Sequence, residues 1–148
     1  MFFEGYFETE KYFSEIKDLI LKEFNFIDQM KYMKSPYFYD LSSSNSVSIC
    51  LRQNRFSEGK GKVFNIKSSE KSTNFTKEQI IFINKSINFF KNRIDNPKFF
   101  LWSNDFKNIK PNQFNEKIIL VNHDEKFYPD IDKRCLDLFL ISVCKNHI

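Results

Sequence analysis

The stretch "NPKFFLWSND", residues 96–105, decides the fold. It opens with an Asn-Pro pair, and proline ends a preceding helix because it lacks a backbone N–H and clashes with the preceding turn. Four consecutive apolar residues follow, from Phe99 to Trp102, and Ser103, Asn104 and Asp105 come after them. A short unbroken apolar run is typical of a strand that is buried on both faces, as in a parallel sheet. We therefore predict a parallel sheet with a polar strand end at residues 103–105.

Helical patterns lie on both sides of this strand. Apolar residues at three-to-four spacing predict three amphipathic helices. The helix before the strand has Thr76 and Gln79 as a capping box and a stripe of Ile80, Ile83, Ile87, Phe90 and Ile94. A helix at residues 9–24 has a stripe that we expect to face the core: Tyr12, Phe13, Ile16, Leu19, Ile20 and Phe24. The last helix has Leu136, Phe139, Leu140 and Val143 on one face.

Two further strands complete the pattern. They are predicted at Val47–Arg52 and Lys117–Val121, with loops at 31–45 and 53–72. Strands and helices thus alternate without an internal repeat. This succession predicts an α/β fold with an open, Rossmann-like, mostly parallel sheet and helices on both faces.

Charge and hydropathy set aside several classes of partner. The chain has 148 residues and a net charge of +4, and its basic residues are mixed with acidic ones. Nucleic-acid binding favours basic residues gathered on one face, so we expect no nucleic-acid partner. No apolar run approaches the roughly 20 residues of a transmembrane helix, and the amino terminus lacks a signal-peptide pattern. We expect a cytoplasmic protein, and peripheral association with a membrane stays open.

The cysteines and histidines lack the spacing of metal ligands. Cys50, Cys135 and Cys144 contain no C-x-x-C pair, and His123 and His147 form no H-E-x-x-H motif. We therefore predict no disulfide framework, no metal site and no cofactor, and we interpret all five residues as structural.

Polar residues also end the strand in "SVSICLRQNRF", residues 46–56. Arg52 stands at this strand end and Asp105 at the other, and ligands of open α/β sheets bind outside the carboxyl ends of strands. A guanidinium can hold two phosphate oxygens at once, and a carboxylate can accept hydrogen bonds from the N–H groups of guanine. The pair suits a nucleoside diphosphate. The alternative is that Arg52 and Arg55 are loop cations that pair with surface acids.

Four segments, in order, resemble one known family. "EGYFETEKYFSEIKDLILKEF" at 4–24 is similar to a segment in which Gly-Tyr-Phe-Gln-Ser-Glu-Lys-Tyr-Phe opens a helix. "SVSICLRQNRF" resembles a His-x-Arg-Arg-Gly-Asp-Tyr motif, and "NPKFFLWSND" resembles a Phe-Ser-Asp-Asp strand end. "DLFLISVCKNHI" at 137–148 resembles an Asp-Leu-Tyr-Leu-Met-Ser-x-Cys-Lys helix. The family is glycosyltransferase family 11, the α-1,2-fucosyltransferases.

The resemblance implies roles for individual residues. Arg52 takes the position of the arginine that holds the diphosphate of GDP-fucose, which makes it the implied catalytic residue. Asp105 takes the position of an aspartate associated with the guanine ring. Cys50, Gln53 and Arg55 replace the histidine, the second arginine and the aspartate of the motif, and would line the same GDP-sugar site.

The resemblance also implies an architecture and a reaction. The family has a GT-B fold, in which two Rossmann-like domains face a cleft, and its reaction is a metal-independent, inverting transfer of fucose from GDP-fucose to a glycan hydroxyl. Its Gly-Gly-Leu-Gly-Asn-Gln opening and its Ala-Asn-Ser-Ser-Phe-Ser-Trp-Trp segment do not occur in these 148 residues. We expect a linking helix and loop at 1–45 and part of the nucleotide-sugar-binding domain at 46–148.

Two other classes of protein stay open. The chain could be a catalytically inactive nucleotide-binding or interaction module, since the motif is altered. It could also bind RNA, since Phe and Lys interleave in "FFKNRIDNPKFF" at 89–100, although helical spacing explains these aromatics as core residues. Binding of GDP would separate the first class from the second.

Overall fold

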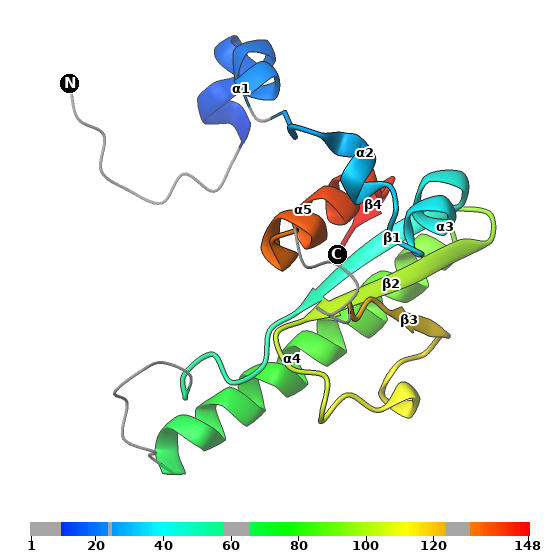
Figure 1. The fold of residues 1–148 in the computed structure, drawn as a ribbon. Coiled ribbons are helices and arrows are strands. Elements are labelled where there is room, and N and C mark those ends of the chain that lie inside the picture. The colour runs from blue at the N-terminus through cyan, green and yellow to red at the C-terminus, as the bar shows by residue number, and fades with distance from the viewer. Residues whose placement is uncertain (1–9, 24, 58–65, 124–130) are drawn as a thin grey trace.

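The computed structural model has a sheet between two layers of helices (Figure 1). It describes residues 10–23, 25–57, 66–123 and 131–148. The elements in chain order are η1 (Glu10–Ile16), α1 (Lys17–Glu23), α2 (Gln29–Tyr32), α3 (Phe38–Ser43), β1 (Asn45–Leu51), α4 (Ile66–Lys91), β2 (Pro97–Ser103), η2 (Pro111–Gln113), β3 (Ile118–Leu120), α5 (Lys133–Val143) and β4 (Asn146–His147). Helix α4 covers one face of the sheet, and α5 covers the other together with α2 and α3.

The described sheet has four strands in the order β3-β2-β1-β4, and every pairing is parallel. The register of the central pair runs from Asn45 opposite Pro97 to Leu51 opposite Ser103. This arrangement confirms the predicted α/β fold with a parallel sheet.

Strand β2 joins the two halves of the core. Phe99 and Leu101 pack against α4, whereas Phe100 and Trp102 pack against α5, because successive strand residues point to opposite faces. All four are at most 5% exposed. Burial of each large side chain stabilises the fold by about 1.5 to 3 kcal/mol, which is why this run needs no alternation.

Several predicted boundaries are wrong. Helix α4 begins at Ile66, well before the predicted cap, and the Thr76 hydroxyl donates to the Ser72 carbonyl at 2.9 Å from inside the helix. The predicted loop at 31–45 contains α3 and the second half of α2, and β1 ends at Leu51 rather than at Arg52. The last helix ends at Val143, and β4 follows it. A helix that covers a sheet exposes most of its surface, so it can contain many polar residues. The apolar pattern of these helical segments is therefore weak.

The expectation that the stripe at 9–24 faces the core is also wrong for the residues that the structure describes, and Phe24 lies outside them. Tyr12 is 65% exposed and Leu19 is 57% exposed, and α1 has no buried residue. Figure 1 shows α1 apart from the sheet. The physical reason is that Tyr32 and Phe38 already pack on α5 from the same side, so the core there is closed without α1.

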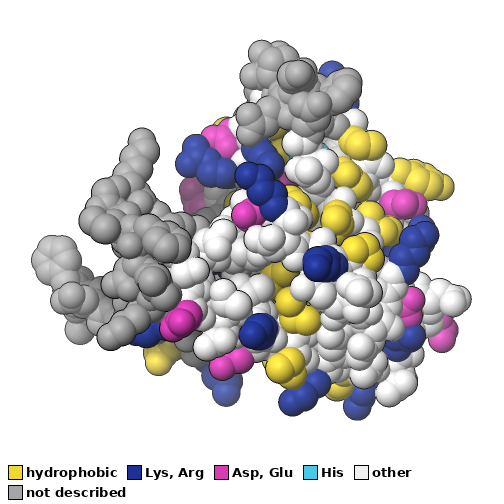
Figure 2. Space-filling model, turned by 90° about the horizontal axis from the view of Figure 1, so that it is seen from below, with side chains coloured by type: hydrophobic (Ala, Val, Ile, Leu, Met, Phe, Trp, Pro, Cys, Tyr) yellow, Lys and Arg dark blue, Asp and Glu magenta, His cyan; other side chains and the backbone are white. Residues whose placement is uncertain are grey.

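The surface carries charges of both signs. Figure 2, seen from below Figure 1, shows Lys and Arg side chains interspersed with acidic and hydrophobic ones. Within the described part of the chain, no helix is both long enough and apolar enough to cross a bilayer.

Candidate functional site

Successive strands are first added on one side of β1 and then on the other, so the strand order reverses beside β1. From β1 the chain passes through α4 to β2 and then to β3 on one side, and it returns through α5 to β4 on the other side. In open α/β sheets, ligands bind outside the carboxyl ends of the strands at such a switch point. Arg52 is the first residue after β1, so its backbone lies at this position.

Two side-chain amides hold the chain as it leaves β1. The Gln79 amide of α4 accepts a hydrogen bond from Arg52 N–H at 3.2 Å and donates one to the Arg52 carbonyl at 2.8 Å. Asn104 does the same for the next residue: its Oδ1 accepts from Gln53 N–H at 2.7 Å and its Nδ2 donates to the Gln53 carbonyl at 2.9 Å. The backbone at the strand end is therefore fixed from both α4 and β2.

The following turn is fixed as well. Asn54 has a left-handed φ of 56°, which asparagine tolerates better than most residues. The Ser57 N–H donates to the Asn54 carbonyl at 3.0 Å, and the Ser72 hydroxyl accepts from Phe56 N–H at 3.0 Å. Residues 52–57 thus form one ordered loop at the switch point.

The basic side chains and the amide side chain of the predicted site differ in their exposure to solvent. Arg52 and Arg55 both have exposed side chains, and the Arg55 guanidinium lies 5.2 Å from the centre of the Phe75 ring. Gln53 instead is 5% exposed, and its Nε2 donates to the Asp105 carbonyl. Gln53 therefore joins the ends of β1 and β2, and its side chain is directed to the protein rather than to a ligand.

Asp105 lies beside the same loop, at the end of β2. Its Oδ1 accepts from Lys107 N–H at 2.9 Å, and its Oδ2 is 3.4 Å from the Asn54 amide nitrogen, which donates to it. The two strand ends carrying Arg52 and Asp105 are thus joined by hydrogen bonds between their loops. The carboxylate already stabilises a local turn, which is a sufficient structural reason for an aspartate here.

Cys50 lies on the opposite face of β1 from the α4 core. Its odd-numbered neighbours Ile49 and Leu51 pack in that core, so Cys50 points toward the α5 side. Packing against neighbouring groups and, secondly, the Asp137 carboxylate raise the pKa of the Cys50 thiol, although the residue as a whole is exposed. The thiol is therefore neutral near pH 7 and is a weak hydrogen-bond donor.

Sequence reasoning missed the two amides that hold the loop. The local pattern assigns Gln79 to a capping box and Asn104 to a polar strand end. Their signal was weak because each bonds to backbone distant in sequence, which no local pattern reveals.

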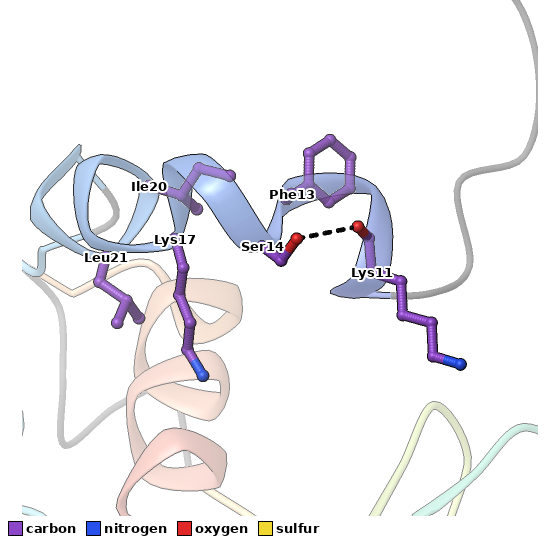
Figure 3. A pocket seen from close by; sticks show the side chains of 6 residues that line it. All are labelled: Lys11, Phe13, Ser14, Lys17, Ile20 and Leu21. Carbon is purple, nitrogen blue, oxygen red and sulfur yellow. Dashed lines mark hydrogen bonds between the residues drawn. The ribbon is translucent and has the colours of Figure 1, made fainter.

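A cavity of about 310 Å³ lies elsewhere, on η1 and α1. Its lining is Lys11, Phe13, Ser14, Lys17, Ile20 and Leu21 (Figure 3). The Ser14 hydroxyl donates to the Lys11 carbonyl at 3.2 Å within this lining. None of the predicted site residues contributes to it, so we do not place the candidate site there.

The described residues include no group of three His, Cys, Asp or Glu side chains arranged to hold a metal ion. No family model, curated protein or solved structure matches the chain.

Proposed function

We propose that the chain binds a guanine nucleotide sugar at the carboxyl end of β1 and contributes to glycosyl transfer from it, as part of a GT-B-like α-1,2-fucosyltransferase. The observation that carries the proposal is the position of Arg52 at the switch point, with its backbone held by Gln79. A side chain on a fixed backbone loses less conformational freedom when a ligand binds.

The loop offers several donors to a diphosphate. Arg52 and Arg55 have exposed guanidinium groups. Within the described residues, the backbone N–H groups of Asn54 and Arg55 make no hydrogen bond. Successive free N–H groups at a turn can form a concavity that binds anions. A guanidinium near the departing diphosphate would stabilise the charge that develops as the sugar–phosphate bond breaks.

Asp105 would read the guanine ring. A carboxylate has about four sites for accepting hydrogen bonds, and here two donors, from Lys107 and Asn54, are in place. The remaining lone pairs could accept the N1–H and amino group of guanine. Adenine has no such adjacent pair of donors, so the proposal includes a preference for GDP over ADP.

One observation favours a second candidate, a module that binds the nucleotide without transferring the sugar. Gln53 stands where the resembling family has a second arginine, and its buried side chain bonds to the protein. One charge that would stabilise the departing diphosphate is thereby lost. Binding would then persist while transfer is slow or absent.

Calorimetric titration with GDP and ADP tests the proposal. We expect GDP to bind more tightly, and Asp105→Asn to reduce the difference while its side-chain oxygen still accepts from Lys107. Equal affinities for GDP and ADP would remove Asp105 from base recognition, and binding of neither would contradict the proposal. Incubation with GDP-fucose and glycan acceptors separates transferase from module, because only the transferase releases GDP and fucosylates the acceptor.

A further inference from the structure

The segment formed by η1 and α1 has an apolar face that stays exposed in the described chain. The face consists of Phe13, Ile16, Leu19 and Ile20. Phe13 is 38% exposed, Ile16 48% and Leu19 57%, and Ile20 is partly exposed. The apolar stripe of a helix is normally covered, either by the same chain or by a partner. The chain itself leaves this stripe open, so the stripe calls for a partner.

The type of helix explains why these side chains share a face. Side chains three residues apart are eclipsed in a 3₁₀-helix, which aligns Phe13 with Ile16 in η1. Side chains three and four residues apart share a face in an α-helix, which adds Leu19 and Ile20. Figure 3 shows Phe13 and Ile20 on one side of the segment and Lys17 on the other. Phe13 and Ile20 also line the cavity of about 310 Å³, so there is room beside them for apolar side chains from outside.

One edge of this face carries opposite charges toward its two ends. Glu15 and Lys22 are seven residues apart, which is about two helical turns, so they lie along the same edge. Within the described residues, neither side chain forms an ion pair in the single chain. The edge is thus acidic toward the amino terminus and basic toward the carboxyl terminus. Such an edge is complementary to a second copy of itself that runs in the opposite direction.

We propose that this face pairs two copies of the chain in antiparallel orientation around a two-fold axis. In this arrangement Ile16 packs against Leu19 of the second copy, as side chains of paired helices interlock. On the charged edge, Glu15 then lies beside Lys22 of the second copy. Two-fold symmetry repeats each contact. The pairing does not depend on the proposed nucleotide site.

Both edges favour the antiparallel orientation. It brings Phe13 beside Ile20 of the second copy, at the cavity that these two residues line. A parallel pair would place Glu15 against Ile20 of the second copy and leave the carboxylate without a cation. The segment carries charges of both signs, so it suits a second copy better than an anionic membrane, which attracts clusters of basic residues.

Sedimentation velocity of the full chain at about 5 to 500 µM tests the pairing. Two helices of this length bury less than a standard interface, so we expect a reversible dimer with a micromolar dissociation constant. Leu19→Asp places a carboxylate in the middle of the face and should weaken dimerisation by about a hundredfold or more. Phe82→Asp is the matched control, because Phe82 is 62% exposed on α4, and it should dimerise like the unaltered chain. Both positions are exposed, so far-ultraviolet circular dichroism should be unchanged.

Charge reversal tests the orientation. Glu15→Lys and Lys22→Glu each place like charges opposite one another at two symmetric positions, and each should weaken dimerisation roughly tenfold. The double variant Glu15→Lys/Lys22→Glu restores both pairs with reversed polarity and should recover most of the affinity. A parallel dimer would show no such recovery.

The proposal is supported if Leu19→Asp abolishes dimerisation, Phe82→Asp retains it and the double reversal restores it. It is overturned if the chain stays monomeric throughout this range, if Leu19→Asp still dimerises, or if Phe82→Asp is equally disruptive. Antiparallel pairing is refuted if the double reversal dimerises no better than the single ones. If a monomeric chain instead floats with vesicles that contain phosphatidylglycerol, and Leu19→Asp prevents this, the face docks on a membrane and the proposal is wrong.

Discussion

Asn104→Ala should destabilise the protein by removing the contact that holds the end of β1 to the end of β2. Its amide makes two hydrogen bonds to the Gln53 backbone, at 2.7 and 2.9 Å. Gln53 is 5% exposed, so water can replace these bonds only in part. At roughly 1 kcal/mol net for each hydrogen bond, the free energy of unfolding should fall by about 2 kcal/mol.

Urea denaturation measures this loss. Urea slopes for small proteins are about 1–3 kcal/mol per molar, so the midpoint should fall by about 1 M. Far-ultraviolet circular dichroism is the primary probe, since Trp102 is close enough to position 104 for its fluorescence baseline to change. Asn104→Asp keeps an acceptor for Gln53 N–H but loses the donor, and should show a smaller loss than Asn104→Ala.

Asn108→Ala is the matched control, because Asn108 is exposed and lies in the next turn. If Asn104→Ala and Asn108→Ala have the same midpoint, the two hydrogen bonds do not hold the loop in solution. The backbone around Arg52 would then be held by Gln79 of α4 alone.

Three further predictions concern the rest of the fold. Phe100→Ala should cost about 3–5 kcal/mol in the same urea titration, since the side chain is fully buried in the α5 core; a loss below about 1 kcal/mol would contradict that burial. Hydrogen bonds from Arg134 lower the pKa of Asp132 to about 2, so its contribution to α5 is complete above about pH 4 and is lost as the pH falls toward 2, and carboxyl titration by NMR should show this midpoint. Burial raises the pKa of the Cys144 thiol to about 11, so alkylation at pH 8 followed by mass spectrometry should find Cys135 modified and Cys144 intact until the protein is denatured.

The fold could be predicted largely because its central strand is unambiguous. The run from Phe99 to Trp102 admits burial on both faces, and the helical stripes around it have a clear period. Helix α4 begins earlier than predicted because residues 66–75 contain no glycine or proline, and a polar composition does not prevent a helix that is mostly exposed. Periodicity indicates that a segment such as 9–24 is helical, but it cannot reveal whether another element already covers the core.

The candidate site could be predicted only in part. The position of Arg52 could be predicted because the change from apolar to polar residues marks the end of the strand. The hydrogen bonds of Gln79 and Asn104 to the loop depend on tertiary contacts between residues far apart in the sequence. The burial of Gln53 likewise depends on the meeting of two strand ends.

The central claim is that Arg52 binds the diphosphate of a nucleotide, and calorimetric titration of Arg52→Ala with GDP tests it most directly. A charge-assisted contact contributes about 1.5–3 kcal/mol, so Arg52→Ala should bind GDP roughly 10- to 150-fold more weakly. Arg52→Lys restores the charge without the planar fork and should recover only part of this loss. Arg55→Ala is the control, because the Arg55 guanidinium lies over Phe75, and it should cost much less. If Arg52→Ala folds and binds GDP as tightly as the unaltered protein, Arg52 is a surface cation and the account is wrong.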